Sequence, residues 1–371
     1  MYRTFNRQIL SEPEGGFFSA FPVPDFLAMA SLGFDISDDS IKAIELLEAA
    51  GAYEVGFYAS KDIPKETIEG GEVLDPTRLQ RVVAEMQREH RFIFVKASLP
   101  EQKAYLFTTT VEVSRGTPMR QKIEEQLEEN VPLSQDEIVF DYKIYRTYKK
   151  KNKTYKDVRV SAISRTHSES YISLLKRSGL RPISLTIEAE AITRAVVPEG
   201  DKDTYMIMDL GKARTGISIV SEGVTRYTYT SEVGGSQLTE HIANKLNLSF
   251  EEAEERKHAS GLTGKNEEAR IVSEASEEKL DVLAKQINDV LRYWHSQVDE
   301  RGVHAKRVNA VILCGGGALM KGLPAYIQNN FSIEAALANV WSNVPFRKHY
   351  VPSITFEDSL SYAAAIGLAL E

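Results

Sequence analysis

A pattern of three closely spaced strands occurs twice in this 371-residue chain. Each copy starts with a short apolar strand that ends in an aspartate, followed by a polar turn and two more strands. The first copy spans residues 32–60 and the second spans residues 206–230. Three strands joined by tight turns form an antiparallel meander, and helical sequence follows each meander. Such a duplication predicts an α/β fold of two related lobes with a cleft between them.

Further segments are expected within and around the two lobes. Pro22 and Pro24 break any helix near the N-terminus. The last predicted helix, 359–370, is small and apolar, so we expect it to be buried and to pack back toward the region between the lobes. The predicted order is a lead-in segment (1–24), a first lobe (25–200) with an inserted subdomain at about 100–166, and a second lobe (201–371) with a helical subdomain at about 236–305.

Composition excludes several classes of protein. The chain has 45 Lys and Arg against 53 Asp and Glu, a net charge of −8, which disfavours generic binding to nucleic acid or anionic membranes. Its one cysteine, Cys314, rules out an intramolecular disulfide and lies on an apolar strand, where we expect it to pack. The longest uncharged stretch, 308–320, is shorter than the roughly 20 apolar residues of a membrane span. We therefore expect a cytosolic protein.

Two turns place a carboxylate at the end of a buried strand. The first is GFDIS at 33–37, with Asp35, and the second is DLGKARTG at 209–216, with Asp209. Backbone N–H groups in such turns can cradle phosphate oxygens, and the carboxylates can hold a hydrated Mg²⁺. The alternative is ordinary turn chemistry, because Asp and Gly are common wherever a strand ends.

A run of three glycines, Gly315, Gly316 and Gly317, follows the predicted strand at 308–314. Glycines without side chains allow a flat ligand to lie against bare backbone. The helix predicted at 323–330 offers its N-terminus to an anion. The alternative is a tight turn between a strand and a helix, for which one glycine would suffice.

Together these segments have the order and spacing of the actin-like nucleotide-binding fold, the group of actin, heat-shock chaperone ATPases, sugar kinases and FtsA. Within this group the chain most resembles the PilM family of type IV pilus assembly. The resemblance runs from about Pro24 to the end, and the GG-x-QLTE-x-IA and FEEAEE-x-K pieces are more specific than the glycine loops. It includes FPVPDFLAMASLGFDIS at 21–37, the stretch 231–264, ILCGGGALMKGL at 312–323 and SYAAAIGLAL at 361–370.

The resemblance implies a site for ATP and Mg²⁺ between the lobes, with Asp35 and Asp209 as the metal-binding carboxylates. Glu254 and Lys257 match positions that contact ribose and adenine. The alternative for this pair is an exposed ion pair on a helix face. The implied nucleotide-binding residues are Asp35, Ser37 and Ser40 in the first turn, Asp209, Gly211 and Thr215 in the second turn, Glu254, Lys257, and Gly315, Gly316 and Gly317.

One acidic residue is a candidate for catalysis. Glu188 matches an acidic position in the helix that joins the lobes of the family, where a carboxylate can orient a hydrolytic water. The alternative is a glutamate favoured by the helix macrodipole at an N-terminus. The chain also departs from the family in the first turn, where Ser37 stands in place of glycine and Asp38 and Asp39 follow it. Serine lacks the freedom of glycine at positive φ, and extra carboxylates repel a triphosphate unless they point away or hold metal.

The implied function is that of a cytoplasmic nucleotide-binding scaffold, at most a weak ATPase, that binds the cytoplasmic N-terminal tail of a PilN-like bitopic inner-membrane protein. The resemblance also implies that the inserted subdomain is of the PilM/FtsA type and that the protein attaches to the inner membrane through its partner. Motor ATPases and self-association are further contacts that the resemblance leaves open. The alternatives are an active ATPase or kinase and an FtsA-like filament, although no amphipathic membrane helix follows the last helix, so no direct membrane anchor is expected.

A basic stretch stands apart from these motifs. Residues 143–159 carry eight Lys and Arg and three tyrosines. Such a stretch is typical either of a nucleic-acid or anionic-lipid patch or of a hairpin whose charges protect a sheet edge. We favour the hairpin, since the charges lie at a predicted turn and the chain is acidic, and we expect no nucleic-acid partner.

Overall fold

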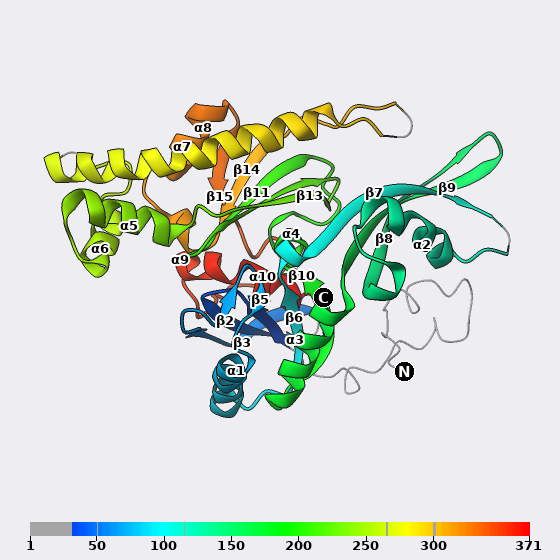
Figure 1. Ribbon diagram of the computed structural model, residues 1–371, viewed down its shortest axis with the longest axis horizontal. Coiled ribbons are helices and arrows are strands. Elements are labelled where there is room, and N and C mark those ends of the chain that lie inside the picture. Colours follow the sequence, from blue (N-terminus) through cyan, green and yellow to red (C-terminus); the bar gives the residue numbers. More distant parts are fainter. Residues whose placement is uncertain (1–31, 50, 115, 265, 300–301) are drawn as a thin grey trace.

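The computed structural model describes residues 32–371 except 50, 115, 265 and 300–301, so the expected lead-in segment 1–24 lies outside the described residues. Two five-stranded sheets form the body of the molecule (Figure 1). The division of the chain at residue 200 remains a prediction, but the two sheets use strands from opposite sides of it.

The first sheet has the order β10-β6-β1-β2-β3. β1 pairs antiparallel with β2 and parallel with β6, and β6 pairs parallel with β10. The carboxyl ends of the three parallel strands therefore meet at one edge, where β1 ends next to Asp35. The strands are β1 (Leu32–Ile36), β2 (Ser40–Ala49), β3 (Ala52–Asp62), β6 (Phe94–Leu99) and β10 (Arg181–Ile187).

The second sheet repeats this order and these strand directions as β15-β14-β11-β12-β13. β11 pairs antiparallel with β12 and parallel with β14, and β14 pairs parallel with β15. The predicted duplication and the two-lobed actin-like fold class are therefore confirmed. The strands are β11 (Thr204–Leu210), β12 (Thr215–Ser221), β13 (Val224–Ser231), β14 (Ala310–Cys314) and β15 (Glu334–Leu337).

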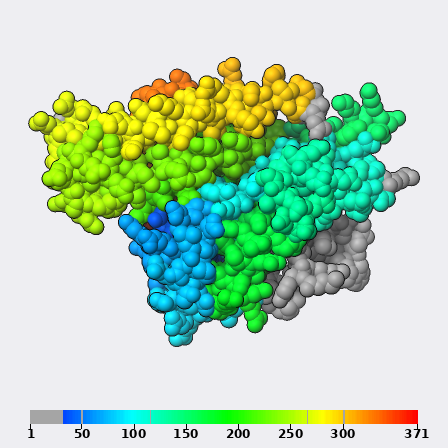
Figure 2. Space-filling model, in the orientation of Figure 1, coloured from blue at the N-terminus to red at the C-terminus, as the bar shows by residue number. Residues whose placement is uncertain are grey.

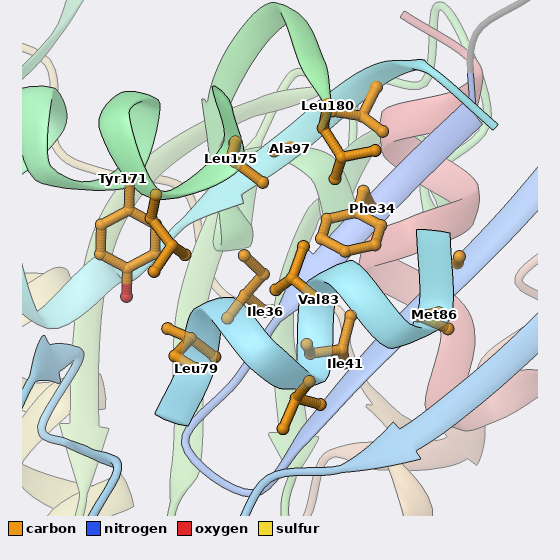
Figure 3. Packing of buried hydrophobic residues seen from close by; sticks show 14 of the residues in the cluster. Phe34, Ile36, Ile41, Leu79, Val83, Met86, Ala97, Tyr171, Leu175 and Leu180 are labelled. Atoms are coloured by element: carbon orange, nitrogen blue, oxygen red, sulfur yellow. The ribbon is translucent and has the colours of Figure 1, made fainter. Parts of the chain in front are cut away.

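Helices α1 (Pro76–His90) and α3 (Arg165–Arg177) pack against the first sheet. The Asp75 side chain caps α1 by accepting a hydrogen bond from the Arg78 backbone N–H, as its position before Pro76 predicts. Apolar residues three or four apart on α1 then face the sheet. Figure 3 shows this core, with Leu79, Val83, Met86, Tyr171 and Leu175 from the helices gathered around Phe34, Ile36, Ile41 and Ala97 from the strands.

Two short helices, α4 (Glu188–Val196) and α10 (Ala363–Ala369), pack closely together between the sheets. A Cβ added at Gly367 would lie 1.7 Å from the Ala191 carbonyl oxygen, so only glycine allows the helices to approach this closely. The predicted helix 359–370 is interrupted, with α9 (Phe356–Ser359) and α10 separated by a 3₁₀ turn. In that turn the Leu360 carbonyl accepts a hydrogen bond from the Gly315 backbone N–H, 2.9 Å away, and so ties the C-terminal segment to the glycine run.

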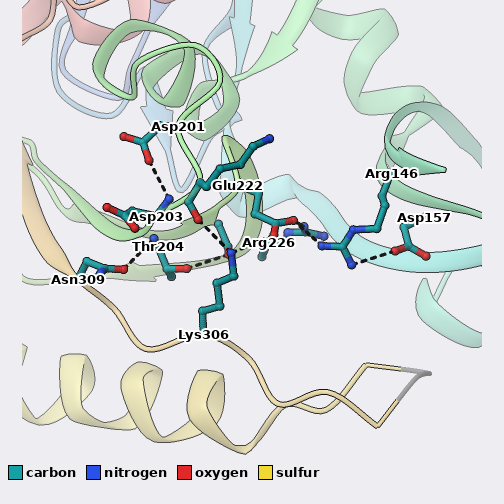
Figure 4. A network of polar contacts seen from close by, with 11 residues as sticks. Arg146, Asp157, Asp201, Asp203, Thr204, Glu222, Arg226, Lys306 and Asn309 are labelled. Carbon is teal, nitrogen blue, oxygen red and sulfur yellow. Dashed lines mark hydrogen bonds and ion pairs between the residues drawn. The ribbon is translucent and has the colours of Figure 1, made fainter. Parts of the chain in front are cut away.

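An additional three-stranded sheet of order β7-β9-β8 is inserted between β6 and α3. Helix α2 (Met119–Asn130) packs on it through Ile123 and Leu127. The outer end of this insert reaches across to the second lobe. There Arg146 donates to Glu222, whose carboxylate also accepts from Lys306 (Figure 4). The strands are β7 (Ala104–Val113), β8 (Ile138–Lys150) and β9 (Lys153–Ser164).

Helices α5 (Gly235–Leu246), α6 (Phe250–Ser260) and the long α7 (Glu267–Ser296) lie together beside the second sheet (Figure 1). α7 packs on this sheet through a stripe that includes Leu280, Leu283 and Ile287, and α8 (Leu323–Phe331) joins the same core. A short hairpin of β4 (Ile68–Glu69) and β5 (Glu72–Val73), which the sequence pattern did not predict, precedes α1.

Candidate functional site

Two adjoining cavities lie along the second turn and the glycine run. The larger has a volume of about 310 Å³ and the smaller about 260 Å³, and both are lined by Gly211, Lys212 and Gly316. The structure brings every sequence-predicted site residue to one or both. Asp35, Ser37, Ser40, Glu188, Asp209, Gly211, Gly315 and Gly316 line the larger cavity, and Gly211, Thr215, Glu254, Lys257, Gly316 and Gly317 line the smaller one.

Asp35 and Asp209 occupy matching positions at the ends of β1 and β11. The Asp35 side chain is 4% exposed, and burial raises its pKa although nearby Lys42 opposes this shift. Burial and the charge of Asp35 together raise the pKa of Asp209 to about 6. Oδ1 of Asp35 is buried without a hydrogen-bond partner among the described residues. Two neighbouring carboxylates with an unused oxygen fit a divalent cation, which would relieve both repulsion and desolvation.

Sequence reasoning missed two charged residues that act on Asp35 and Asp209 in the larger cavity. Glu101 follows β6 and is 7% exposed, and burial, with a contribution from Asp209, raises its pKa to about 8. Its carboxylate accepts a hydrogen bond from Thr230 of the other lobe, at 3.0 Å. Lys42 lies directly opposite Asp35 in the β1–β2 ladder, so the two share one face of the sheet. The signals were an acid two residues after a strand parallel to β1, and a lysine in register with Asp35.

Glu188 is the first residue of α4 and lines the larger cavity. Burial raises the pKa of Glu188 well above its usual range, and the charges of Asp35 and Asp209 raise it further. The alternative of a helix N-terminal glutamate is correct as to position. Burial beside two carboxylates, however, distinguishes Glu188 from a solvated helix cap, because the carboxylate form is disfavoured there.

The first turn avoids one of the two problems expected from its sequence and reduces the other. Ser37 does not adopt a positive φ, so glycine is not required there, and its hydroxyl bonds the Ser40 backbone carbonyl at 3.0 Å. The Asp38 carboxylate accepts hydrogen bonds from the Gly70 and Gly71 backbone N–H groups, at 3.0 and 3.1 Å, and pairs with Arg214 of the second turn. One of the two extra carboxylates is therefore neutralised by a cation from the opposite lobe.

Backbone geometry explains the glycine run. Gly315 has a φ of +80°, and a Cβ there would lie 2.4 Å from an Asp209 carboxylate oxygen. Gly317 lies against the Leu210 carbonyl oxygen, which would be 2.9 Å from an added Cβ. At Gly316, by contrast, a Cβ would meet no atom within 4 Å, so its open face borders both cavities. The run therefore presents bare backbone where the two cavities meet.

Glu254 and Lys257 pair on α6, but Lys257 is only 7% exposed, which contradicts the alternative of an exposed ion pair. Lys257 Nζ donates to Glu254 at 2.7 Å, to Thr239 at 2.8 Å and to the Gly235 carbonyl at 3.1 Å. Burial lowers the pKa of Lys257. Burial alone would raise the pKa of Glu254, but hydrogen bonds from Lys257 and Thr239 lower it overall. The pair thus presents a carboxylate and a lysine stem to the smaller cavity.

Thr215 and Gly211 fix the shape of the second turn. Gly211 donates its backbone N–H to the Arg214 carbonyl at 2.9 Å, which closes the turn. The buried Thr215 hydroxyl donates to the Val233 carbonyl at 2.6 Å. Because its hydroxyl is occupied in this way, Thr215 shapes the turn and leaves its methyl group for the cavity wall.

The two cavities suit different parts of one ligand. The larger is lined by seven acidic and three basic residues, so an anion alone would be repelled, whereas an anion carrying a divalent cation would be accommodated. The smaller has apolar walls that include Leu238, Leu280 and Leu323, with Glu254 and Lys257 at one side, as a flat ring with a polar sugar requires. No group of three His, Cys, Asp or Glu side chains in the described residues could by itself hold a metal.

The family model of type IV pilus assembly protein PilM matches residues 33–371. A solved PilM–PilN type IV pilus biogenesis complex has a TM-score of 0.75 and 20% identity, covering 92% of this chain and 98% of that chain. The ethanolamine utilization protein EutJ from Carboxydothermus hydrogenoformans has a TM-score of 0.53 and 16% identity over 94% of this chain and 91% of its own. These structural likenesses show the fold.

Curated relatives include the cell division protein FtsA of Enterococcus faecalis, 25% identical over 44% of this chain and 40% of that protein. FtsA of Borreliella burgdorferi is 22% identical over 58% of this chain and 54% of its own length. The chain thus spans about half the length of the curated relatives it matches. No helix in the described part of the chain is long and apolar enough to cross a membrane.

Proposed function

Because the chain belongs to the family of type IV pilus assembly protein PilM, we propose that it is a nucleotide-binding scaffold that binds the cytoplasmic N-terminal tail of a PilN-like inner-membrane protein. The match to a PilM–PilN complex over 92% of this chain supports this partner. Through it the protein would lie at the cytoplasmic face of the inner membrane. Contacts with pilus motor ATPases and self-association belong to the same proposal.

The nucleotide is ATP with Mg²⁺, and the two adjoining cavities are the observation that carries this assignment. The polyphosphate would lie between the first and second turns, with Ser37, Ser40 and Gly211 beside it. Asp35 and Asp209 would hold the hydrated Mg²⁺, whose chemistry is to offset phosphate charge. The adenosine would lie against Gly315, Gly316 and Gly317, with Glu254 near the ribose and Lys257 covering the base.

Burial of Glu188 favours a scaffold over an active ATPase. A carboxyl whose pKa is raised well above its usual range is protonated over more of the pH scale and is then a poor acceptor for a proton from water. We therefore propose at most weak hydrolysis, with Glu188 as the group that would orient the water. Turnover that Glu188→Gln abolishes would favour the enzyme alternative, and turnover equal to that of buffer would favour the scaffold.

The architecture supports communication between the nucleotide and the rest of the protein. The inserted subdomain leaves the first lobe after β6, yet Arg146 at its outer end bonds Glu222 of the second lobe at 2.6 Å (Figure 4). Movement of one lobe against the other would therefore strain or shift the insert. A nucleotide that binds one lobe arrangement more tightly than the other would shift the population toward that arrangement, and so change the surface offered to the tail.

A paired titration tests the proposal. We expect the tail peptide of the PilN-like protein to bind the purified chain by isothermal titration calorimetry, and its affinity to change when MgATP is present. By thermodynamic reciprocity, the peptide then changes the affinity for MgATP by the same factor. Absence of peptide binding with and without MgATP would rule out the scaffold. An FtsA-like filament, the remaining alternative, would instead appear as MgATP-dependent pelleting without the peptide.

A further inference from the structure

The outer end of the β8–β9 hairpin carries a concentration of positive charge that the proposed function does not use. Residues 143–156 contain seven Lys and Arg and no Asp or Glu, in a chain with a net charge of −8. The hairpin extends from the body at the end of the inserted sheet, in teal and green in Figures 1 and 2. We call Lys149, Lys150 and Lys151 the basic tip.

The turn itself places a lysine at the outermost position. Lys150 lies opposite Lys153 in the ladder, so Lys151 and Asn152 form a two-residue turn with φ values of +48° and +60°. Asn is common in such turns, but Lys at positive φ is disfavoured relative to Gly or Asn. The strand alternation places Lys149 on the face opposite Lys150, so the three consecutive lysines spread their charges around the end of the hairpin.

Two basic residues of the hairpin, Arg146 and Lys153, form ion pairs with other described residues, whereas the three consecutive lysines at its end do not. Arg146 pairs with Asp157 and Glu222, and Lys153 pairs with Glu112 at 2.9 Å. Lys149, Lys150 and Lys151 are exposed. No acidic side chain in the described part of the chain lies within ion-pair distance of these three. Their charges are therefore available to an external anionic surface.

The aromatic residues of the hairpin argue against single-stranded nucleic acid. Tyr148 and Tyr155 lie opposite each other in the ladder, and their rings stack with centroids 5.7 Å apart. The Tyr145 ring is covered by the Arg226 guanidinium, 3.7 Å from its centroid. Proteins that bind single strands leave aromatic faces open for bases to stack on. Here the three rings are engaged within the protein, whereas Lys149, Lys150 and Lys151 are exposed.

We propose that the basic tip contacts anionic phospholipid headgroups at the membrane surface. This inference rests on the proposed function, because the PilN-like partner is what would bring the tip to the membrane. Anionic cytoplasmic leaflets attract clustered lysines, each by about fivefold in partitioning. The attraction decays within about 8 Å at physiological salt, so a protruding tip can be attracted while the more acidic body, held further away, is weakly repelled. The tip would thus orient a scaffold held by its partner's tail.

Vesicle co-sedimentation of the full chain without any PilN-like peptide tests the contact directly. The variant combines Lys149→Ser, Lys150→Ser and Lys151→Asn, the last suited to the positive φ. The matched control combines Lys65→Ser, Lys202→Ser and Lys285→Ser, which removes the same charge from exposed lysines that lie apart on the surface. Vesicles contain phosphatidylcholine with about 30% phosphatidylglycerol as the anionic lipid, or phosphatidylcholine alone. The melting temperature of each variant is measured to check that the variant folds.

We expect the unaltered chain and the control variant to bind anionic vesicles more tightly than neutral ones, with affinity falling as salt rises. The tip variant should lose binding on the order of 100-fold, about fivefold for each of three lysines. Equal binding by the tip and control variants would overturn the proposal. Absence of binding to anionic vesicles at low salt would overturn it as well. So would tip-dependent binding to single-stranded DNA together with no binding to vesicles. Since no peptide is present, the outcome is separate from that of the peptide titration.

Discussion

The ion pair between Asp38 and Arg214 joins the two turns across the cleft and can be removed by one substitution. The two side chains are only 12% and 14% exposed. Nε and Nη1 of Arg214 are also buried without hydrogen-bond partners among the described residues, so the guanidinium has donors to spare for an anion. We predict that Asp38→Asn frees Arg214 for the phosphates and tightens the binding of MgATP.

The size of the effect follows from charge and burial. A side-chain charge and a phosphate charge about 8 Å apart interact by about 2 kcal/mol at an effective dielectric constant of 20. Screening in an open cleft reduces this interaction to about 1 kcal/mol. Removal of one negative charge and release of one positive charge together predict binding about tenfold tighter. The free energy of unfolding of Asp38→Asn should fall by about 1–3 kcal/mol. This is less than the loss expected when one partner of a fully buried ion pair is removed, because Arg214 keeps some access to solvent.

Calorimetric titration of MgATP into three variants checks this reasoning. Asp39→Asn is the matched control, because Asp39 lines the same cavity but forms no ion pair with the described residues. It should tighten binding by no more than about threefold through charge alone. Arg214→Ala should weaken binding. The role given to the pair would be refuted if Asp38→Asn bound MgATP no more tightly than the unaltered chain, or only as tightly as Asp39→Asn.

Two further predictions concern stability. Gly367→Ala places a Cβ 1.7 Å from the Ala191 carbonyl oxygen, so α4 and α10 must separate. Thermal unfolding should then show a free energy of unfolding lower by about 3 kcal/mol. A decrease below about 1 kcal/mol would argue against the close helix contact. Glu101 has a pKa raised to about 8, so the folded state binds its proton more tightly than the unfolded state, and stability should fall as the pH rises from about 4.5 to 8. Glu101→Gln should flatten this part of the stability profile, and an unchanged slope in denaturant melts at several pH values would contradict the assignment.

Much of the fold was predictable because its signals are local. The three-strand meander at 32–60 and the cap at Asp75 follow from alternation, turn residues and capping chemistry. β15 and the β4–β5 hairpin were missed, because strands of four and two residues carry no detectable periodicity. The break before α10 was also missed. At this break the Leu360 carbonyl accepts a hydrogen bond from Gly315 N, a contact between residues distant in sequence that periodicity does not reveal.

The candidate site divides in the same way. Asp35, Asp209 and the glycine run were found, because each lies at the end of an apolar strand. Arg214 lies within the second motif at 209–216, but its ion pair with Asp38 depends on how the two lobes face each other, which sequence spacing does not determine. The concern over Ser37 was unfounded, because the turn closes through the side chains and backbone of Ser37 and Ser40 without a positive φ.

Calorimetric titration of MgATP into the unaltered chain and into Gly316→Val tests the central claim most directly. A Cβ added at Gly316 would meet no protein atom within 4 Å, and the position needs no positive φ, so the variant should fold with an unchanged melting temperature. Its added methyl groups would nevertheless occupy the junction of the two cavities. The account predicts saturable binding of MgATP to the unaltered chain and a loss of at least about tenfold in the variant. Equal affinities, or no binding to the unaltered chain, would contradict it.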